Sequence, residues 1–217
     1  MNLVGHLVVG MWVAAVEPTD DVALGAMLPD LAAMAGLRVE RARLPSQVAE
    51  GVGLHHRADA VFHAQTWFVE AVTADSRALQ DAGLPRGAAR ACAHVGVELL
   101  LDGLLLERAP VADSLRVALA GLTSERLGAL TEAEAERWEG LFRRLRDGDR
   151  LTGAYATAVG VAERLSWILA RRPRLRLDRR HTGVLIERLE TRRAELEGRA
   201  EARVAAVVGD LAGFGSA

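Results

Sequence analysis

Apolar side chains recur through this chain at spacings of three and four residues, the period of an α-helix with one buried face. The stripe is clearest over residues 178–211, where it comprises Val184, Leu185, Leu189, Leu196, Val204, Val207 and Leu211. No segment shows the alternation of apolar and polar residues that is typical of a half-buried strand. Ala, Leu, Val, Arg and Glu dominate the composition, and only 4% of the residues are aromatic. We therefore predict an all-α bundle that ends in a long helix, and neither a β-sandwich nor a barrel.

Proline, glycine and capping residues separate the predicted helices. We expect helices over residues 3–16, 22–28, 46–82, 86–108, 111–119, 131–146, 151–171 and 178–211. Asp20 or Asp21 is expected to cap the second helix, which Pro29 ends. Thr131 and Glu134 have the spacing of a capping box.

Charge divides the chain near Pro110. Residues 1–110 hold 8 Arg and 13 acidic residues, whereas residues 111–217 hold 19 Arg and 16 acidic residues. The chain has no lysine, which excludes Schiff-base chemistry on a lysine and a P-loop lysine. We expect a helical core with a metal site over residues 1–110 and an arginine-rich helical half over residues 111–217, packed together as one domain.

Six arginines in residues 171–180 are the strongest charge feature of the sequence. One interpretation is a docking surface for an anionic partner such as an acidic carrier protein, and the other is a solvated linker whose arginines pair with nearby acids. The pI near 6.3 and the few aromatic residues argue against a dedicated nucleic-acid-binding protein. The terminal helix is expected either to form a homodimer through its stripe or to pack on its own domain. His181, beside Arg179 and Arg180, is expected at the surface.

The single cysteine, Cys92, excludes an internal disulfide framework and a cysteine-rich metal site, so a reducing compartment is the simplest assumption. The apolar residues 1–16 lack the basic start and the small-residue cleavage pattern of a signal peptide. No other apolar run is long enough to span a bilayer. We therefore expect a cytoplasmic protein without a membrane partner.

Two segments place histidine and carboxylate residues at every fourth position. The first set is His55, Asp59 and His63, and the second is His94, Glu98 and Asp102. Each set falls on one narrow stripe of a helix, and a helical bundle can bring two such stripes together. Imidazole and carboxylate are ligands that Zn²⁺, Mn²⁺ and Fe²⁺ accept where no thiolate is available. The simpler interpretation is that the histidines are hydrogen-bonded core residues and that the pairs are surface ion pairs.

His6 and Asp30 extend the candidate ligands to a set sufficient for one or two ions. Asp30 follows Leu28 and Pro29 at a predicted helix end, where an aspartate is more often a cap. Asp102 lies among six leucines, so its carboxylate must be paired or bound to a metal if it points inward. The alternative for Asp102 is a place on an exposed edge.

Four short motifs within residues 1–108 occur in an order known from one protein family. Residues 1–7, Met-Asn-Leu-Val-Gly-His-Leu, are similar to an opening Met-Asn-x-x-Ala-His-Leu, and residues 24–30, Leu-Gly-Ala-Met-Leu-Pro-Asp, to a Gly-Asn-x-x-x-Asp turn. Residues 51–59 are similar to Gly-Ile-x-x-His-Arg-x-Ile-Asp, and residues 98–102 to Asp-x-x-x-Asp-His. In these motifs the chain resembles the acyl carrier protein phosphodiesterases, all-helical relatives of the HD-type metal-dependent phosphohydrolases. It departs from the family pattern at Ala26, His63, Glu98 and Gly103, where the family has Asn, Asp, Asp and His.

The resemblance implies an HD-like fold and a hydrolase that removes the phosphopantetheine arm from holo acyl carrier protein with Mn²⁺ or a similar ion. It implies that the metal is held by His6, Asp30, Asp59 and Asp102. His55, His63 or His94 would complete the shell or protonate the leaving group. Arg57 would bind the phosphate with two hydrogen bonds, although a solvated helix arginine is more common.

Two alternatives remain open. The order of the candidate ligands is also similar to that of the zinc-dependent phospholipase C and nuclease group. A protein of a different class would be a catalytically silent relative that binds a partner through its basic half.

Overall fold

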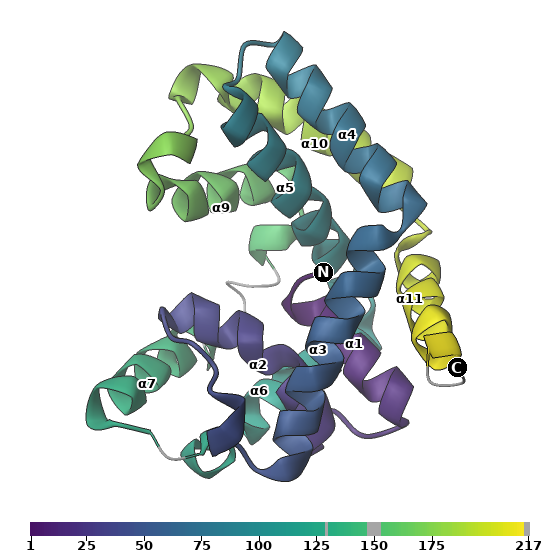
Figure 1. The fold of residues 1–217 in the computed structure, drawn as a ribbon. Coiled ribbons are helices and arrows are strands. Elements are labelled where there is room, and N and C mark those ends of the chain that lie inside the picture. The colour runs from purple at the N-terminus through teal and green to yellow at the C-terminus, as the bar shows by residue number, and fades with distance from the viewer. Residues whose placement is uncertain (129, 147–152, 215–217) are drawn as a thin grey trace.

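The computed structural model describes residues 1–128, 130–146 and 153–214, and every regular element within these ranges is a helix (Figure 1). The all-α prediction is therefore confirmed for this part of the chain. The α-helices are α1 (Leu3–Ala14), α2 (Asp21–Ala35), α3 (Ser46–Ala64), α4 (Thr66–Asp81), α5 (Arg86–Leu106), α6 (Ala109–Gly121), α7 (Glu132–Arg146), α9 (Ala158–Ala170), α10 (Thr182–Leu196) and α11 (Ala200–Phe214). Short 3₁₀ turns are η1 (Arg41–Arg43), η2 (Ser124–Leu127), η3 (Pro173–Leu175) and η4 (Arg179–His181).

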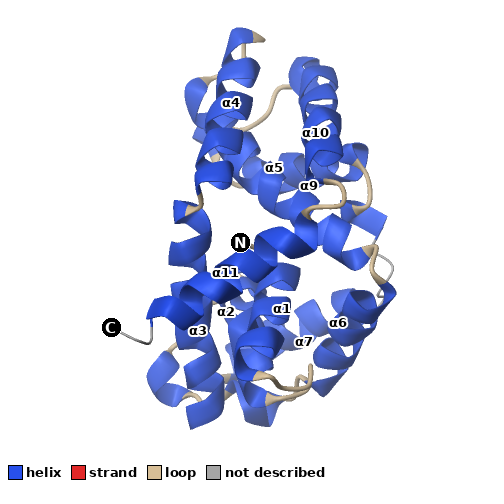
Figure 2. Ribbon diagram, turned by 90° about the vertical axis from the view of Figure 1, so that its right-hand side faces the viewer, coloured by secondary structure: helices blue, strands red, loops and turns tan. Residues whose placement is uncertain are grey.

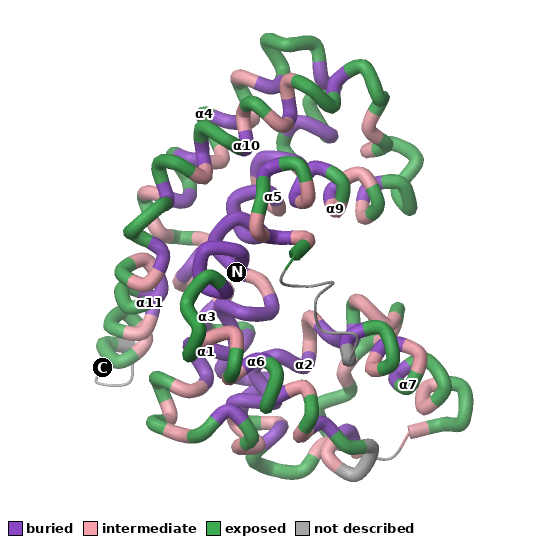
Figure 3. The backbone as a smooth tube through the Cα atoms, turned by 180° about the vertical axis from the view of Figure 1, so that it is seen from behind, coloured by how far each residue is buried: buried purple, intermediate pink, exposed green. Residues whose placement is uncertain are grey.

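Helix α5 runs through the middle of the molecule (Figure 1). Every residue from Gly96 to Leu106 is buried, which gives the long buried stretch of α5 in Figure 3. Helices α4, α9 and α10 pack around its first half, and α1 and α6 contact it as well. Helix α11 lies on α1 and α3 (Figure 2). The arginine-rich half therefore packs on the first half around one shared hydrophobic core.

Two glycines allow α2 and α3 to approach each other closely. A Cβ atom on Gly25 would lie 2.3 Å from the backbone oxygen of Val48, and one on Gly51 would lie 2.2 Å from that of Val22. No side chain fits at such a distance, so only glycine permits this contact between the two backbones. The approach places the histidine stripe of α3 directly beside α2.

Two of the predicted helices are each divided in two. The helix predicted over residues 46–82 breaks at Gln65, whose extended backbone (φ −60°, ψ 126°) separates α3 from α4. No proline or glycine marks this break. The helix predicted over residues 178–211 breaks at Gly198 (φ 70°), a left-handed position that favours glycine, between α10 and α11. The prediction of one long terminal helix is therefore wrong.

Helix α2 does not end at Pro29, as predicted, but continues to Ala35. Pro29 removes one backbone hydrogen bond inside the helix, and we attribute the continuation to the burial of Leu31 and Ala32 beyond it, both in the core. Asp30 therefore lies on a helix and not in a turn. The Asp30 carboxylate therefore faces the first turns of α1.

Several local predictions can be compared directly with the structure. Asp20 caps α2 by accepting a hydrogen bond from Val22, and Thr131 and Glu134 form the expected capping box. His181 is buried, not exposed as predicted, at the start of α10. Residues 151 and 152 of the predicted helix 151–171 lie outside the described residues. The prediction of one continuous helix is wrong for the residues that follow them, because α9 begins only at Ala158, where the side chain of Thr157 caps it. No described helix is long and apolar enough to cross a membrane.

Candidate metal centre

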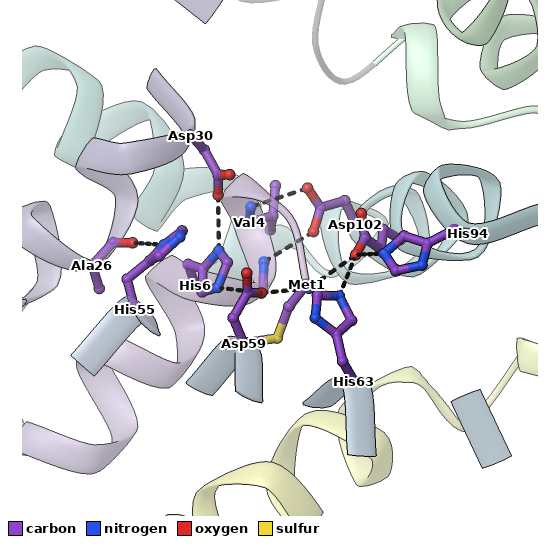
Figure 4. A network of polar contacts seen from close by, with 12 residues as sticks. Met1, Val4, His6, Ala26, Asp30, His55, Asp59, His63, His94 and Asp102 are labelled. Carbon is purple, nitrogen blue, oxygen red and sulfur yellow. Dashed lines mark hydrogen bonds and ion pairs between the residues drawn. The ribbon is translucent and has the colours of Figure 1, made fainter. Parts of the chain in front are cut away.

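Six histidine and carboxylate side chains gather beside the start of α1 in two groups (Figure 4). The inner group consists of His6 from α1 with His55 and Asp59 from α3. The outer group consists of His63 from the last turn of α3 with His94 and Glu98 from α5. In each group, one potential ligand atom from every residue lies within 4.8 Å of the others. The two helical stripes thus face each other across the N-terminus of α1.

Both histidines of the inner group are oriented by an oxygen on their outer side. His6 is fully buried, and its Nδ1 donates to Asp30 Oδ2 at 2.8 Å. His55 Nδ1 donates to the carbonyl oxygen of Ala26 at 2.9 Å. Because a carbonyl can only accept, the proton of neutral His55 lies on Nδ1 and the Nε2 lone pair is free. Metal-binding histidines typically use their second nitrogen in this manner.

The inner side of His6 has no hydrogen-bond partner. Its buried Nε2 lies 3.2 Å from Asp59 Oδ1, but not in hydrogen-bonding geometry. An imidazole lone pair beside a carboxylate oxygen is repulsive unless a proton or a cation lies between them. This buried nitrogen beside a carboxylate is the feature of the inner group that best suits a bound cation.

The pKa values of the inner group follow from its charges. Burial lowers the pKa of His55 to about 4, so this imidazole is neutral near pH 7. Burial alone would raise the pKa of Asp59, but contact with His6 and with the α-ammonium group of Met1 outweighs it and holds that pKa well below its usual range. Burial alone would lower the pKa of His6, but the carboxylates of Asp30 and Asp59 raise it. Asp59 is therefore ionised and attracts a cation.

In the outer group, two imidazoles converge on one carboxylate oxygen. His63 Nε2 lies 2.8 Å and His94 Nε2 lies 3.2 Å from Glu98 Oε1. Burial alone would raise the pKa of Glu98, but these contacts and the charge of Met1 hold it well below its usual range. The ring of Phe68 lies beside both imidazoles, with centroids 5.3 Å from His63 and 5.1 Å from His94. Glu98 and Phe68 therefore hold the two imidazoles of the outer group in place.

The α-ammonium group of Met1 connects the two groups. Its nitrogen lies 2.8 Å from Asp59 Oδ1 and 3.1 Å from Glu98 Oε1. The two carboxylates are therefore within two hydrogen-bond lengths of each other around a positive charge. The ammonium group occupies the space between the two groups and pairs with both carboxylates.

Two of the predicted ligands lie outside both groups. Asp30 contacts the outer nitrogen of His6, and so acts as a positioning residue. Asp102 is fully buried, and its two oxygens accept hydrogen bonds from the backbone N–H groups of Val4 (3.1 Å) and Gly5 (2.9 Å). It therefore caps the first turn of α1 from a neighbouring helix, which satisfies N–H groups that have no partner within α1.

Gly103 stands where the resembled family has histidine. A Cβ atom there would lie 2.0 Å from the backbone oxygen of Tyr155. The segment before α9 thus occupies the space that a side chain would need, and no ligand from this position is compatible with the fold.

A groove of about 580 Å³ between α4 and α5 opens onto the outer group. His63 and His94 line it, and so do Arg77, Arg86 and Arg90. The predicted phosphate-binding residue, Arg57, is exposed on α3 and is neither in the two groups nor among the residues that line this groove. Sequence analysis missed the groove arginines, although Arg86 and Arg90 precede His94 by eight and four residues on the same stripe of α5.

The donor atoms fit a divalent ion with small adjustments. Zn²⁺ holds nitrogen and oxygen ligands at about 2.0–2.2 Å in a tetrahedron, so two of its ligand atoms are about 3.4 Å apart. The ligand atoms of each group lie within 4.8 Å of one another, and rotation of the side chains has to bring them closer by up to about 1.4 Å. Histidine and carboxylate donors without thiolate suit Zn²⁺, Mn²⁺ or Fe²⁺.

Comparisons with models of known protein families, with curated proteins and with solved structures found no match to this chain. The resemblance to the acyl carrier protein phosphodiesterases, and with it the HD-like fold, stays a prediction from four motifs.

Proposed function

We propose that this protein is a metal-dependent phosphodiesterase. The observation that carries the proposal is the inner group, in which His6 and His55 each donate their outer N–H to an oxygen while His6 Nε2 makes no hydrogen bond and faces Asp59 Oδ1. Hydrogen bonding of this kind fixes an imidazole for metal binding. The adjacent outer group and the cationic groove favour an anionic substrate.

His6, His55 and Asp59 would hold one ion, and His63, His94 and Glu98 could hold a second. A bound divalent ion lowers the pKa of water and neutralises charge on phosphoryl oxygens. The chain's own residues supply the positioning. Asp30 and the Ala26 carbonyl orient the two inner imidazoles, and Asp102 fixes the start of α1, from which His6 projects.

The more exposed outer histidines are suited to contact with substrate. The His63 and His94 side chains are 33% and 39% exposed, whereas that of His6 is fully buried. In a form with one ion, held by the inner group, a protonated imidazole at this position can donate a proton to the leaving alkoxide, and Glu98 holds both rings in reach of the groove. The inner group is thus proposed to bind metal and the outer group to face the substrate.

The test compares the wild-type protein with the double variant Asp59→Asn/Glu98→Gln. A matched control, Glu50→Gln/Glu70→Gln, removes two exposed carboxylates from α3 and α4. Each protein is reconstituted with Mn²⁺ or Zn²⁺, freed of excess ion, analysed by mass spectrometry for bound metal and assayed on bis(p-nitrophenyl) phosphate. Circular dichroism verifies that all three remain helical.

We expect the wild type and the control to retain at least one ion per chain and to hydrolyse the diester, and the double variant to lose both properties. A wild type that binds no metal and is inactive would overturn the proposal and favour the partner-binding alternative. Full activity in the double variant would also overturn it.

The finer proposal, that the diester is the phosphopantetheine linkage of holo acyl carrier protein, rests on the four sequence motifs alone. Incubation with holo carrier protein would release the phosphopantetheine arm, which intact-mass analysis detects. No mass change under conditions where the aryl diester is hydrolysed would refute this substrate and leave the phosphodiesterase proposal standing.

A further inference from the structure

Three arginines line the groove that leads away from the outer group. Arg86 and Arg90 belong to α5, and Arg77 faces them from α4. Within the described residues, none of the three has a carboxylate close enough for an ion pair or makes another polar contact. Asp81 also lines the groove and offsets one of the three positive charges. The groove therefore carries a net positive charge before the histidines are counted.

The positions along α5 give this charge a defined spacing from the reaction centre. Arg90 precedes His94 by four residues and Arg86 by eight, so at 1.5 Å per residue they lie about 6 Å and about 12 Å further along the helix axis. The side chains of Arg86, Arg90 and His94 project from one stripe of α5, because four residues offset a side chain around the helix by only about 40°. The groove thus presents a histidine-carboxylate centre at one end and guanidinium groups at a fixed distance from it.

The wall between these ends is partly apolar. Phe68, Val69 and Val72 from α4 line the part of the groove next to the histidines, and Thr73, Ser76 and Gln80 line the remainder. A groove of this volume is in the range of small-molecule sites. It suits a chain of carbon atoms between two polar ends better than it suits a compact anion.

We propose that the groove binds the second phosphate of an elongated substrate, with the scissile phosphodiester at the two metal-binding groups and a further phosphate on Arg90 and Arg86. Arginine is suited to this task because its planar fork binds phosphate oxygens through two hydrogen bonds. The inference rests on the proposed function, since it assigns the substrate class of the same site. It predicts a low-molecular-weight diester with a phosphate at its far end, a substrate other than the phosphopantetheine linkage of holo carrier protein.

The test measures the binding of non-hydrolysable probes by titration calorimetry to protein reconstituted with Mn²⁺. Hexanediol bisphosphate carries phosphates at both ends of a six-carbon chain, and hexyl phosphate carries one. We expect the bisphosphate to bind about tenfold more tightly than the monophosphate, the gain expected from one charge-assisted contact in an open groove. In Arg90→Gln this advantage should fall to less than about twofold, with hexyl phosphate binding unchanged.

Two controls test whether the effect is specific to the groove and to phosphate. Arg116→Gln removes an exposed arginine from α6, outside the groove, and should leave both affinities unchanged. A hexyl phosphate with a terminal carboxylate tests whether the groove selects phosphate over another anion. Equal affinity for the two anionic tails would overturn the assignment to phosphate.

Failure of this inference is distinguishable from failure of the proposed function. Equal binding of the bisphosphate and the monophosphate, in a protein that binds metal and hydrolyses the aryl diester, would overturn the groove inference alone. Selective binding of the bisphosphate that Arg90→Gln abolishes, in a protein without hydrolytic activity, would support the groove as a phosphate site and overturn the proposed function.

Discussion

Replacement of Asp102 by Asn should change the pH dependence of folding stability. Asp102 is fully buried and accepts hydrogen bonds only from the backbone N–H groups of Val4 and Gly5. Burial raises the pKa of Asp102 to about 7, although the two N–H groups act in the opposite direction. Asparagine has nearly the same shape and carries no charge at any pH.

The sign and size of the effect follow from proton linkage. In the unfolded chain Asp102 titrates near 3.8, so between this pH and about 7 the folded protein binds one more proton than the unfolded chain. The stability contributed by protonated Asp102 is fully present below pH 3.8, falls as the pH rises and is lost above about 7. At about 1.4 kcal/mol per pH unit, this interval corresponds to about 4 kcal/mol.

Urea unfolding of metal-free protein, followed by circular dichroism at unit intervals from pH 4 to pH 8, measures the difference between Asp102→Asn and the wild type. At pH 4 both side chains are neutral in the folded protein, and Asp102→Asn should be less stable than the wild type by about 1–3 kcal/mol, because the Asn amide nitrogen cannot accept a hydrogen bond from Val4 or Gly5. Relative to the wild type, Asp102→Asn should gain about 4 kcal/mol by pH 8. Groups that do not interact with Asp102 titrate alike in both proteins and cancel in the difference, whereas Asp30 and His6, whose charges act on Asp102, contribute to it.

The control is Asp113→Asn, which neutralises an exposed carboxylate on α6 and should follow the wild-type curve. Parallel curves for Asp102→Asn and the wild type would refute the reasoning. They would mean that Asp102 titrates alike in the folded and unfolded chains, and that its burial has no energetic consequence.

Three further predictions concern packing and the candidate metal centre. Asp75→Ala leaves buried Arg192 without its partner carboxylate on α4 and should destabilise the fold by about 3–5 kcal/mol in urea unfolding; a loss below about 1 kcal/mol would contradict this. Gly51→Ala places a methyl group against the Val22 backbone oxygen and should lower the free energy of unfolding by at least about 1–3 kcal/mol, the cost typical of overpacking, and with it the Tm in calorimetry; an unchanged Tm would argue against the close contact. Asp30→Asn should weaken metal binding about 10–100-fold in competition with a chromophoric chelator, and unchanged affinity would show that Asp30 does not orient His6.

Sequence alone determined the helical class of the protein and the residues that could bind metal. Helical periodicity and composition are local properties, and they do not depend on how helices pack. The spacing of four residues in α3 and α5 likewise places side chains on one stripe whatever surrounds it. His55, Asp59, His63, His94 and Glu98 were candidates on that basis and His6 was a separate candidate, and all six lie in the two groups.

The break at Gln65 was not predictable from the residues around it. It contains neither proline nor glycine, and it depends on how α4 packs against α5 after α3 has packed against α2. A helix breaks in this way where one straight helix could not bury the apolar faces of both of its halves. The resulting bend leaves His63 on the last turn of α3, close enough to contact Glu98.

Only the tertiary structure decided which carboxylate serves which purpose. Asp59 and Asp102 each lie on a stripe of histidine and carboxylate residues, yet Asp59 faces a histidine and Asp102 caps α1. The difference arises because α1 enters the bundle with its N-terminal N–H groups against one end of α5. Likewise, Arg90 lines the groove and Arg57 does not, because α4 packs beside the stripe of α5 that carries Arg90. Such pairings depend on the distance and direction between helices, which no local pattern in the sequence contains.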